Sequence, residues 1–256
     1  MKKFLLTVAS VFTAAFAALT AAGCGGKTSG GKTEKILFIG NSFTYYSDVP
    51  AIFKEIADSA GKKVRVESVT QGSWNLSKFA DEKDEYGKQV AQKLSVEDEY
   101  SAVVLQEQST RPLDNYSGFL SGARKLVEKI TSSQKNCRIY LYSTWGYKEE
   151  AASRQMTVPE MEGEIRKAYQ KAAAVLNVKV SYVGKAFSAV YTQYPQYNLY
   201  HSDGKHQSYT GAFLSACVHA ATILNLNPET LSYTGKLDAQ TAEALKSAAQ
   251  KALNGD

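Results

Sequence analysis

Three residues in this chain have the types and the spacing that nucleophilic catalysis by a serine needs. Ser42 stands in the segment "KILFIGNSFTYY" (35–46), directly after an apolar run and a glycine. His206 lies three residues after Asp203 in the segment "NLYHSDGKHQSYTGAFLSA". At that spacing a single turn can hold the carboxylate against the imidazole Nδ1–H, which leaves Nε2 free to accept the serine proton. We therefore expect Ser42, His206 and Asp203 to form a catalytic triad.

The other histidines are weaker candidates for the base. His219 lies in "FLSACVHAATIL", inside an apolar pattern of helical period, which is typical of a packing histidine. His201 also has Asp203 nearby, but it follows a segment expected to be extended, and it ranks second. For Ser42, the alternative is that it merely caps the next helix.

Short apolar runs alternate with segments of helical period from Lys35 onward, which predicts an α/β fold. We expect a three-layer α/β/α sandwich around a mainly parallel, five-stranded sheet. The expected strands are Ile36–Ile39, Val64–Val69, Ala102–Leu105, Arg138–Ser143 and Val178–Val183. The expected helices are Pro50–Ala60, Asn115–Ile130 with Asp114 as its cap, Met156–Leu176, Tyr209–Leu224 and Ala239–Leu253.

Polar residues follow several of these strands directly. Residues 40–42 follow the first strand, 71–73 the second and 106–108 the third, and Trp145 follows the fourth. In open α/β sheets ligands bind at the carboxyl ends of the strands. These groups are therefore expected to converge on one site.

The same segments resemble the SGNH hydrolases, the GDSL-type esterase superfamily, in four ordered blocks between Lys35 and about Leu224. "FIGNSFTYY" resembles the nucleophile block, "GSWNL" the glycine block, "VVLQEQS" the oxyanion block and "DGKH" the Asp-x-x-His block. The match is best to the bacterial branch with a Gly-Asn-Ser-Phe-Thr nucleophile block and a Leu-Gln-Glu-Gln-Ser third block. The resemblance implies ester hydrolysis without a metal or organic cofactor.

The resemblance also implies an oxyanion hole made by the backbone N–H groups of Ser42 and Gly72. The family's third donor is an asparagine amide, which this chain lacks, so Gln108 or Gln106 is expected to replace it. We expect the substrate to contact polar and aromatic residues beside these blocks. They are Asn41, which stands where the family usually has Asp, and Trp74, Asn75, Glu107 and Trp145.

The expected function is a serine esterase that removes O-acyl groups, above all acetyl, from carbohydrate. A lipid esterase of the lysophospholipase or thioesterase type is the enzymatic alternative. The non-enzymatic alternative is a surface lipoprotein that binds glycans through an inactive site. We expect a monomer whose partner is a small-molecule or polysaccharide ester.

The first 23 residues have two lysines, an apolar stretch and the ending "AAGC", which resembles a bacterial lipobox. We therefore expect a signal peptide over 1–23, a lipid on Cys24, a flexible tether over 24–34 and one hydrolase domain over 35–256. The expected location is the bacterial cell envelope outside the cytoplasm, with a lipid anchor in the membrane. Residues 26–33 match a phosphate-binding loop in letters, but no strand precedes them, so nucleotide binding is not expected.

The net charge and the number of cysteines do not favour nucleic-acid binding, a zinc site or a disulfide framework. The formal net charge of +5 becomes +3 when Lys2 and Lys3 leave with the signal peptide, which does not favour nucleic-acid binding. Cys137 and Cys217, the cysteines left besides Cys24, are too few for a zinc site or a disulfide framework.

Overall fold

The structure is a computed structural model that describes residues 33–253. The expected signal peptide, Cys24 and nearly all of the expected tether lie outside the described residues. The first strand begins at Glu34, one residue before the expected start of the domain. Within 33–253, no helix combines the length and the apolar character that a membrane span requires.

Five parallel strands form one sheet in the order β2-β1-β3-β4-β5, so the sheet is wholly rather than mainly parallel. The strands are β1 Glu34–Gly40, β2 Val64–Thr70, β3 Ala102–Leu105, β4 Arg138–Tyr142 and β5 Lys179–Ser181. Ile39 of β1 is level with Val69 of β2 and with Leu105 of β3. The residues that follow these three strands therefore leave the sheet side by side.

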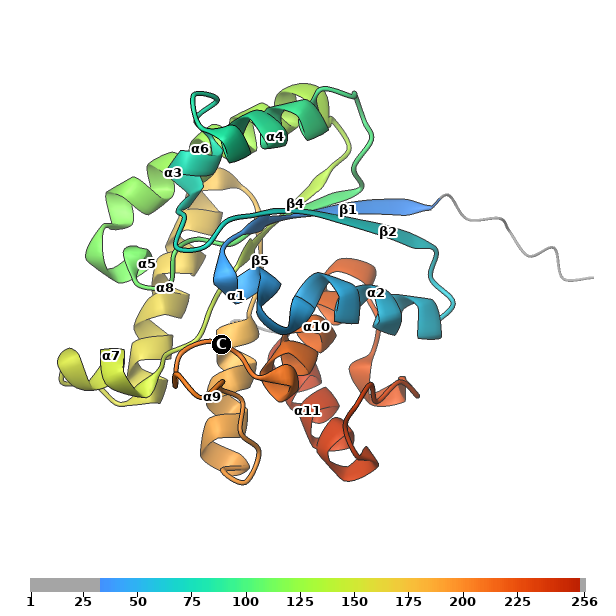
Figure 1. The fold of residues 1–256 in the computed structure, drawn as a ribbon, viewed down its shortest axis with the longest axis vertical. Coiled ribbons are helices and arrows are strands. Elements are labelled where there is room, and N and C mark those ends of the chain that lie inside the picture. The colour runs from blue at the N-terminus through green and yellow to red at the C-terminus, as the bar shows by residue number, and fades with distance from the viewer. Residues whose placement is uncertain (1–32, 254–256) are drawn as a thin grey trace, which may run out of the picture. The chain divides into compact units, whose positions relative to one another are not determined.

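Helices cover both faces of the sheet, which confirms the expected three layers (Figure 1). Helices α2 and α10 pack on one face, with α9 and α11 beside α10, while α6 and α8 lie on the other face, with α3 and α4 beside α6. The longer helices are α2 Val49–Ser59, α4 Glu85–Leu94, α6 Tyr116–Ser133, α8 Val158–Leu176, α9 Val183–Gln193, α10 Tyr209–Leu224 and α11 Ala239–Lys251. The short ones are α1 Ser42–Tyr45, α3 Leu76–Phe79, α5 Arg111–Asp114 and α7 Lys148–Ser153, with 3₁₀ turns at Tyr46–Asp48 and Pro228–Thr230.

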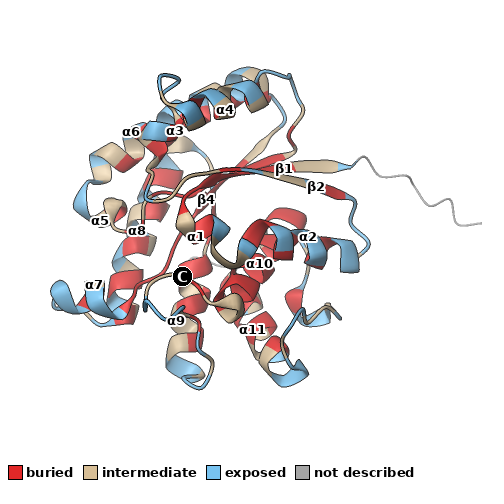
Figure 2. Cartoon of the chain, in the orientation of Figure 1, coloured by how far each residue is buried: buried red, intermediate tan, exposed pale blue. Residues whose placement is uncertain are grey.

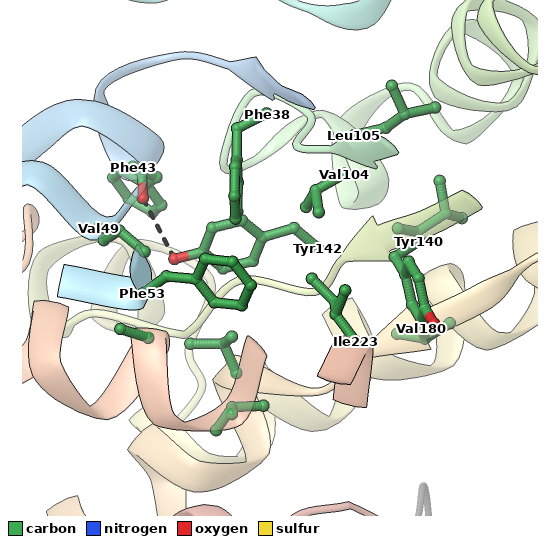
Figure 3. Close-up of a cluster of buried hydrophobic side chains, with 14 of the residues drawn as sticks. Phe38, Phe43, Val49, Phe53, Val104, Leu105, Tyr140, Tyr142, Val180 and Ile223 are labelled. Atoms are coloured by element: carbon green, nitrogen blue, oxygen red, sulfur yellow. Dashed lines mark hydrogen bonds between the residues drawn. The ribbon is translucent and has the colours of Figure 1, made fainter. Parts of the chain in front are cut away.

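The core is continuous through the middle of the sheet. The apolar residues of β1 and β3 are buried, as a sheet covered by helices on each side requires. Figure 2 shows buried residues along the middle of the sheet. On one side Phe38 packs edge-on against Phe53 of α2, and the Tyr142 hydroxyl donates a 3.2 Å hydrogen bond to the carbonyl of Phe43 (Figure 3). This bond joins the core to the helix that carries Ser42.

Two helix starts differ from expectation because a neighbouring residue is the better cap. Asn115, not Asp114, caps α6, since its Oδ1 accepts the N–H of Gly118 at 2.8 Å. Asp114 belongs to α5 and forms an ion pair with Arg154. Helix α8 begins at Val158 rather than Met156, because Thr157 and Glu160 form a capping box.

Gly40 ends β1 at a point where a side chain has no room. A Cβ there would lie 2.7 Å from Oε1 of Gln106 and closer still to the hydroxyl of Thr44. We expect Gly40→Ala to lower the free energy of unfolding by about 1 to 3 kcal/mol, because these buried groups must move. Urea denaturation measures the change.

Gly163 in α8 provides the control, because a Cβ there would meet no atom within 4 Å. Gly163→Ala should leave stability unchanged or raise it by up to about 1 kcal/mol, as alanine is the better helix former. Equal effects of the two substitutions would contradict the steric argument.

Candidate active site

The side chains of Ser42, His206 and Asp203 form a continuous hydrogen-bonded chain. Oγ of Ser42 lies 2.7 Å from Nε2 of His206, and Nδ1 of the same ring lies 2.6 Å from Oδ2 of Asp203. Ser42 and His206 are 164 residues apart in the sequence, so the fold alone brings them together. This is the geometry that a triad of nucleophile, base and orienting acid requires.

The turn that carries Ser42 is fixed from two directions. Asn41 ends the extended segment, and its Oδ1 accepts the N–H of Phe43 at 3.1 Å, so it caps α1. Its Nδ2 donates to the carbonyl of Trp74 at 2.9 Å. Asn41 is therefore buried and connects the nucleophile turn to the loop after β2, and it is not placed for the substrate contact expected from the sequence.

The loop that carries the base is folded around Asp203. Oδ1 of Asp203 accepts the N–H groups of Lys205 and His206, each at 2.9 Å, while Oδ2 faces the imidazole. Gly204 has a φ of +68°, which lets the loop turn tightly between them. The acid and the base therefore belong to one locally hydrogen-bonded turn, as their spacing predicted.

Asp203 remains ionised in this setting. Partial burial acts to raise the pKa of Asp203. Hydrogen bonds from the His206 ring and from the N–H groups of Lys205 and His206 outweigh this effect and lower the pKa to about 2. The Asp203 carboxylate therefore stays charged at neutral pH and can stabilise positive charge on the ring beside it.

Aromatic rings surround the base. The ring of Tyr46 stacks on that of His206 with centroids 4.4 Å apart, and Phe43 contacts the imidazole edge-on. The buried amide of Gln207 donates to the carbonyls of Phe43 and Tyr46 at 3.1 and 2.8 Å. The sequence analysis missed Tyr46 and Gln207, although each is a near neighbour in sequence of a candidate catalytic residue.

The remaining histidines do not contact Ser42. His219 is fully buried, and Nδ1 of its ring lies 2.9 Å from the Ser181 hydroxyl, which agrees with its expected packing role. Burial lowers the pKa of His219 to about 3, so it stays neutral. His201 is exposed, bonded to Ser202 and in edge contact with Tyr46.

Gln106 of the third block has its side chain engaged elsewhere than the donor role expected from it. Oε1 of Gln106 accepts the N–H of Asn41 at 2.8 Å and the Thr44 hydroxyl at 3.0 Å, while Nε2 donates to the carbonyl of Glu107. Gln106 is fully buried, and its side chain holds the turn that carries Ser42 in place.

Gln108 instead stabilises the turn that follows it. Its Oε1 accepts the N–H groups of Thr110 and Arg111 at 3.1 and 3.0 Å, which fixes the orientation of the amide. Its Nε2 lies 3.4 Å from the Ser109 hydroxyl. The hydrogen bonds of Gln106 are thus at odds with the expected replacement of the family's asparagine, whereas Gln108 stays a predicted donor, because its Nε2 carries two N–H groups.

Two backbone groups remain available for an oxyanion. Within residues 33–253, neither the N–H of Ser42 nor that of Gly72 donates to another protein group. The N–H of Gln71, just before Gly72, donates to the carbonyl of Gly40, so the two loops leave the sheet together. Backbone N–H groups in such a position can stabilise developing negative charge.

The residues expected to contact substrate mostly stabilise the fold. Trp145 is buried between Phe43 and Phe187, with ring centroids 4.5 and 4.1 Å away. Asn75 caps α3 through the N–H of Lys78. Trp74 is half-buried against Phe79 and Tyr86, and is the one member of this group with a large ring partly open to solvent beside the site.

Glu107 is fully buried below the site and cannot reach a substrate. Its Oε1 accepts the N–H groups of Gln108 at 2.6 Å and Leu76 at 3.3 Å, so one carboxyl fixes the loops after β3 and β2. Burial raises the pKa of Glu107 to about 7, although the Gln108 N–H, Arg111 and the Leu76 N–H act to lower it.

Glu107 should therefore make stability depend on pH. Between about pH 4.5 and 7 the folded protein keeps a proton that the unfolded chain has released, so the free energy of unfolding falls as the pH rises. A difference of about 2.5 in pKa corresponds to at most about 3 kcal/mol. Glu107→Gln keeps the shape of the side chain but has no proton to release in this range. The difference in free energy of unfolding between the variant and the wild type should therefore change by up to about 3 kcal/mol between pH 4.5 and 7.

Urea denaturation of both proteins at several pH values measures this gap. Other titrating groups, His219 included, contribute equally to both proteins and cancel in the comparison. A gap that stays constant from pH 4.5 to 7 would contradict the raised pKa.

No protein-family model and no curated protein sequence matches the chain. Solved structures do match. A protein of the DUF4886 family from Bacteroides uniformis is 19% identical with a TM-score of 0.76, over 87% of this chain and 95% of that one. A proposed SGNH hydrolase from Slackia heliotrinireducens is 26% identical with a TM-score of 0.63, over 75% of this chain and 100% of that one.

A variant of an acetyl-xylooligosaccharide esterase from Geobacillus is also similar. It is 18% identical with a TM-score of 0.56, over 75% of this chain and 95% of that one. The neighbours in structure thus include SGNH and GDSL-type hydrolases, and the chain has their fold, as the resemblance of its sequence predicted.

Proposed function

We propose that the protein is a serine ester hydrolase. The observation that carries the proposal is the chain of hydrogen bonds from Ser42 Oγ through the His206 ring to the Asp203 carboxylate. It stands at the carboxyl edge of a parallel sheet, where ligands bind in this class of fold. The likeness to solved SGNH hydrolases supports the same conclusion.

The proposed reaction follows from the atoms in place. Oγ of Ser42 attacks the ester carbonyl while Nε2 of His206 takes the hydroxyl proton, and Asp203 stabilises the charged imidazole. The carbonyl oxygen becomes an oxyanion held by the N–H groups of Ser42 and Gly72. As the ester bond breaks, His206 returns the proton to the leaving alcohol. Water, activated by the same Nε2, then releases the acid from Ser42.

The proposed substrate is a short acyl ester, above all an acetyl ester, of a carbohydrate. The surface beside Ser42 carries the exposed ring of Tyr45 and the half-buried ring of Trp74, which suit a sugar better than an extended acyl chain. One structural neighbour is a variant of an acetyl-xylooligosaccharide esterase. Chain-length preference separates this substrate from the lipid esters.

We also propose that the enzyme acts in the cell envelope as a monomer, held to the membrane by a lipid on Cys24. The support is the "AAGC" ending of the first apolar segment and the Gly- and Lys-rich residues after it. Full-length protein expressed in a bacterium should partition into detergent, and Cys24→Ser should prevent this. Equal partition of the two proteins would contradict the anchor.

Hydrolysis of p-nitrophenyl acetate, butyrate and octanoate by residues 33–256 tests the activity. We expect kcat/KM to fall as the acyl chain lengthens. Ser42→Ala and His206→Ala should each lower kcat on the acetate by at least about 10⁴-fold, because nucleophile and base act as one unit. Asp203→Asn should lower kcat on the order of 10⁴-fold, because an asparagine no longer holds the His206 ring in the correct tautomer.

Ser132→Ala is the matched control, because Ser132 is exposed on α6 and bonded only to its own helix. It should retain full activity. Turnover that survives in folded Ser42→Ala would overturn the proposal. Glycan binding without any turnover in the wild type would indicate a binding protein with a hydrolase fold.

A further inference from the structure

A groove lies next to the helix that carries Ser42, and the triad makes no use of it. It has a volume of about 880 Å³ and runs between the start of α2 and the segment before α11. Three tyrosines and three charged residues supply most of its polar and aromatic surface. They are Tyr45, Tyr209, Tyr233, Asp48, Glu55 and Lys236.

Tyr45 lines this groove and lies on the same short helix as Ser42. It is three residues after Ser42 on α1, and residues at that spacing lie on neighbouring positions of a helix. Its side chain is one of the large exposed ones, with 41% of its surface open to solvent. Its hydroxyl lies 3.0 Å from the position that a Cβ on residue 72 would take. The groove therefore begins beside Gly72, one of the two proposed oxyanion donors.

The far side of the groove is held in a fixed shape. The Tyr209 hydroxyl accepts the N–H of Lys236 at 3.0 Å, and the Tyr233 hydroxyl donates to Glu55 of α2. Gly235 has a φ of +58°, and a side chain there would overlap the Tyr209 hydroxyl. A groove whose rings are already positioned loses little freedom when a ligand binds.

The rim between the groove and the base loop is strained. Ser47 and Asp48 both have left-handed backbone conformations, with φ of 52° and 53°, which are unfavourable for residues other than glycine. The Ser47 hydroxyl lies 3.4 Å from the carbonyl of Gln207, and Asp48 caps α2 through the N–H of Ala51. Such strain is found most often where a ligand or a reaction needs it.

The charges indicate which ligand fits. The groove has two carboxylates, Asp48 and Glu55, against one ammonium group, that of Lys236. Glu55 is engaged by Tyr233, and the ammonium of Lys236 lies over the ring of Tyr209 at 5.3 Å. The groove thus has no excess of positive charge for an anionic ligand, while its rings and hydrogen-bonding groups suit an uncharged, hydroxyl-rich one.

We propose that this groove is the carbohydrate subsite, and that it binds an uncharged oligosaccharide whose acylated sugar unit rests on the ring of Tyr45. The proposal rests on the proposed esterase function and specifies the alcohol part of its substrate. In this arrangement the ester carbonyl reaches Ser42 and Gly72 while neighbouring sugar units extend toward Tyr209 and Tyr233.

The test compares two kinds of substrate. One is p-nitrophenyl acetate, and the other is a panel of acetylated oligosaccharides made of xylose, mannose, glucose or N-acetylglucosamine units, with an acetylated oligogalacturonide as the anionic member. Tyr45→Ala should lower the ratio of kcat/KM on the best neutral oligosaccharide to kcat/KM on p-nitrophenyl acetate by about tenfold or more. Tyr45→Phe keeps the ring and should keep most of the ratio.

Tyr197→Ala is the matched control. Tyr197 lines a second tyrosine-rich hollow, of about 400 Å³, beside residues 195–200. Its removal should leave the ratio unchanged. Direct binding gives a second readout: Ser42→Ala should bind the best acetylated oligosaccharide, and adding Tyr45→Ala should raise Kd about tenfold.

The outcomes separate the two proposals. If the wild type hydrolyses none of these substrates, the proposed esterase function itself is overturned. Hydrolysis of p-nitrophenyl acetate but of no neutral oligosaccharide would keep the esterase and overturn the subsite. An unchanged ratio in Tyr45→Ala, a larger loss in Tyr197→Ala, or a preference for the anionic substrate would also overturn the subsite.

Discussion

The hydrogen bonds to the carboxamide oxygen of Gln106 hold the nucleophile turn against the neighbouring strand, and much of the site depends on them. This oxygen accepts both the N–H of Asn41 and the hydroxyl of Thr44. It does so in a space that leaves no room for a side chain on Gly40. Rearranging a buried amide whose polar atoms are all engaged is costly. Ser42 is therefore presented at a fixed position relative to β1 and β3.

A second buried amide extends this order to the base. Gln207 donates to the carbonyl of Phe43, within α1, and to that of Tyr46, just after it, and so joins the loop of His206 to the helix that carries Ser42. Below the loop, the indole N–H of Trp145 donates to the carbonyl of Lys205 at 3.1 Å. The loop that carries His206 is thus held by groups that follow two separate strands, β1 and β4, which suits a site whose polar groups are positioned in advance.

The positions of the strands and the pairing of His206 with Asp203 could be predicted, because both follow from local patterns in the sequence. Apolar runs locate buried strands, and the Asp-x-x-His spacing describes one turn. The directions of side chains after a strand could not be predicted in the same way. Gln106, Glu107 and Trp145 stand at strand ends as expected, but each side chain points into the protein, because its partners come from distant segments such as Leu76 and Phe187. Asn115 displaced Asp114 as a cap for a similar reason: two suitable residues were adjacent, and tertiary contacts with Arg154 decided between them.

Because Asp203 and His206 share one short turn, they form a unit that can move without coming apart. Three hydrogen bonds inside the turn keep the carboxylate on the imidazole, while the bond from Nε2 to Ser42 crosses to another part of the chain. A displacement of residues 201–206 on the timescale of loop motion would therefore break the bond to Ser42 and the bond from Trp145 to Lys205, but leave the pair of Asp203 and His206 intact. Whether the serine is activated would then depend on a single distance, set by how closely this loop sits on α1.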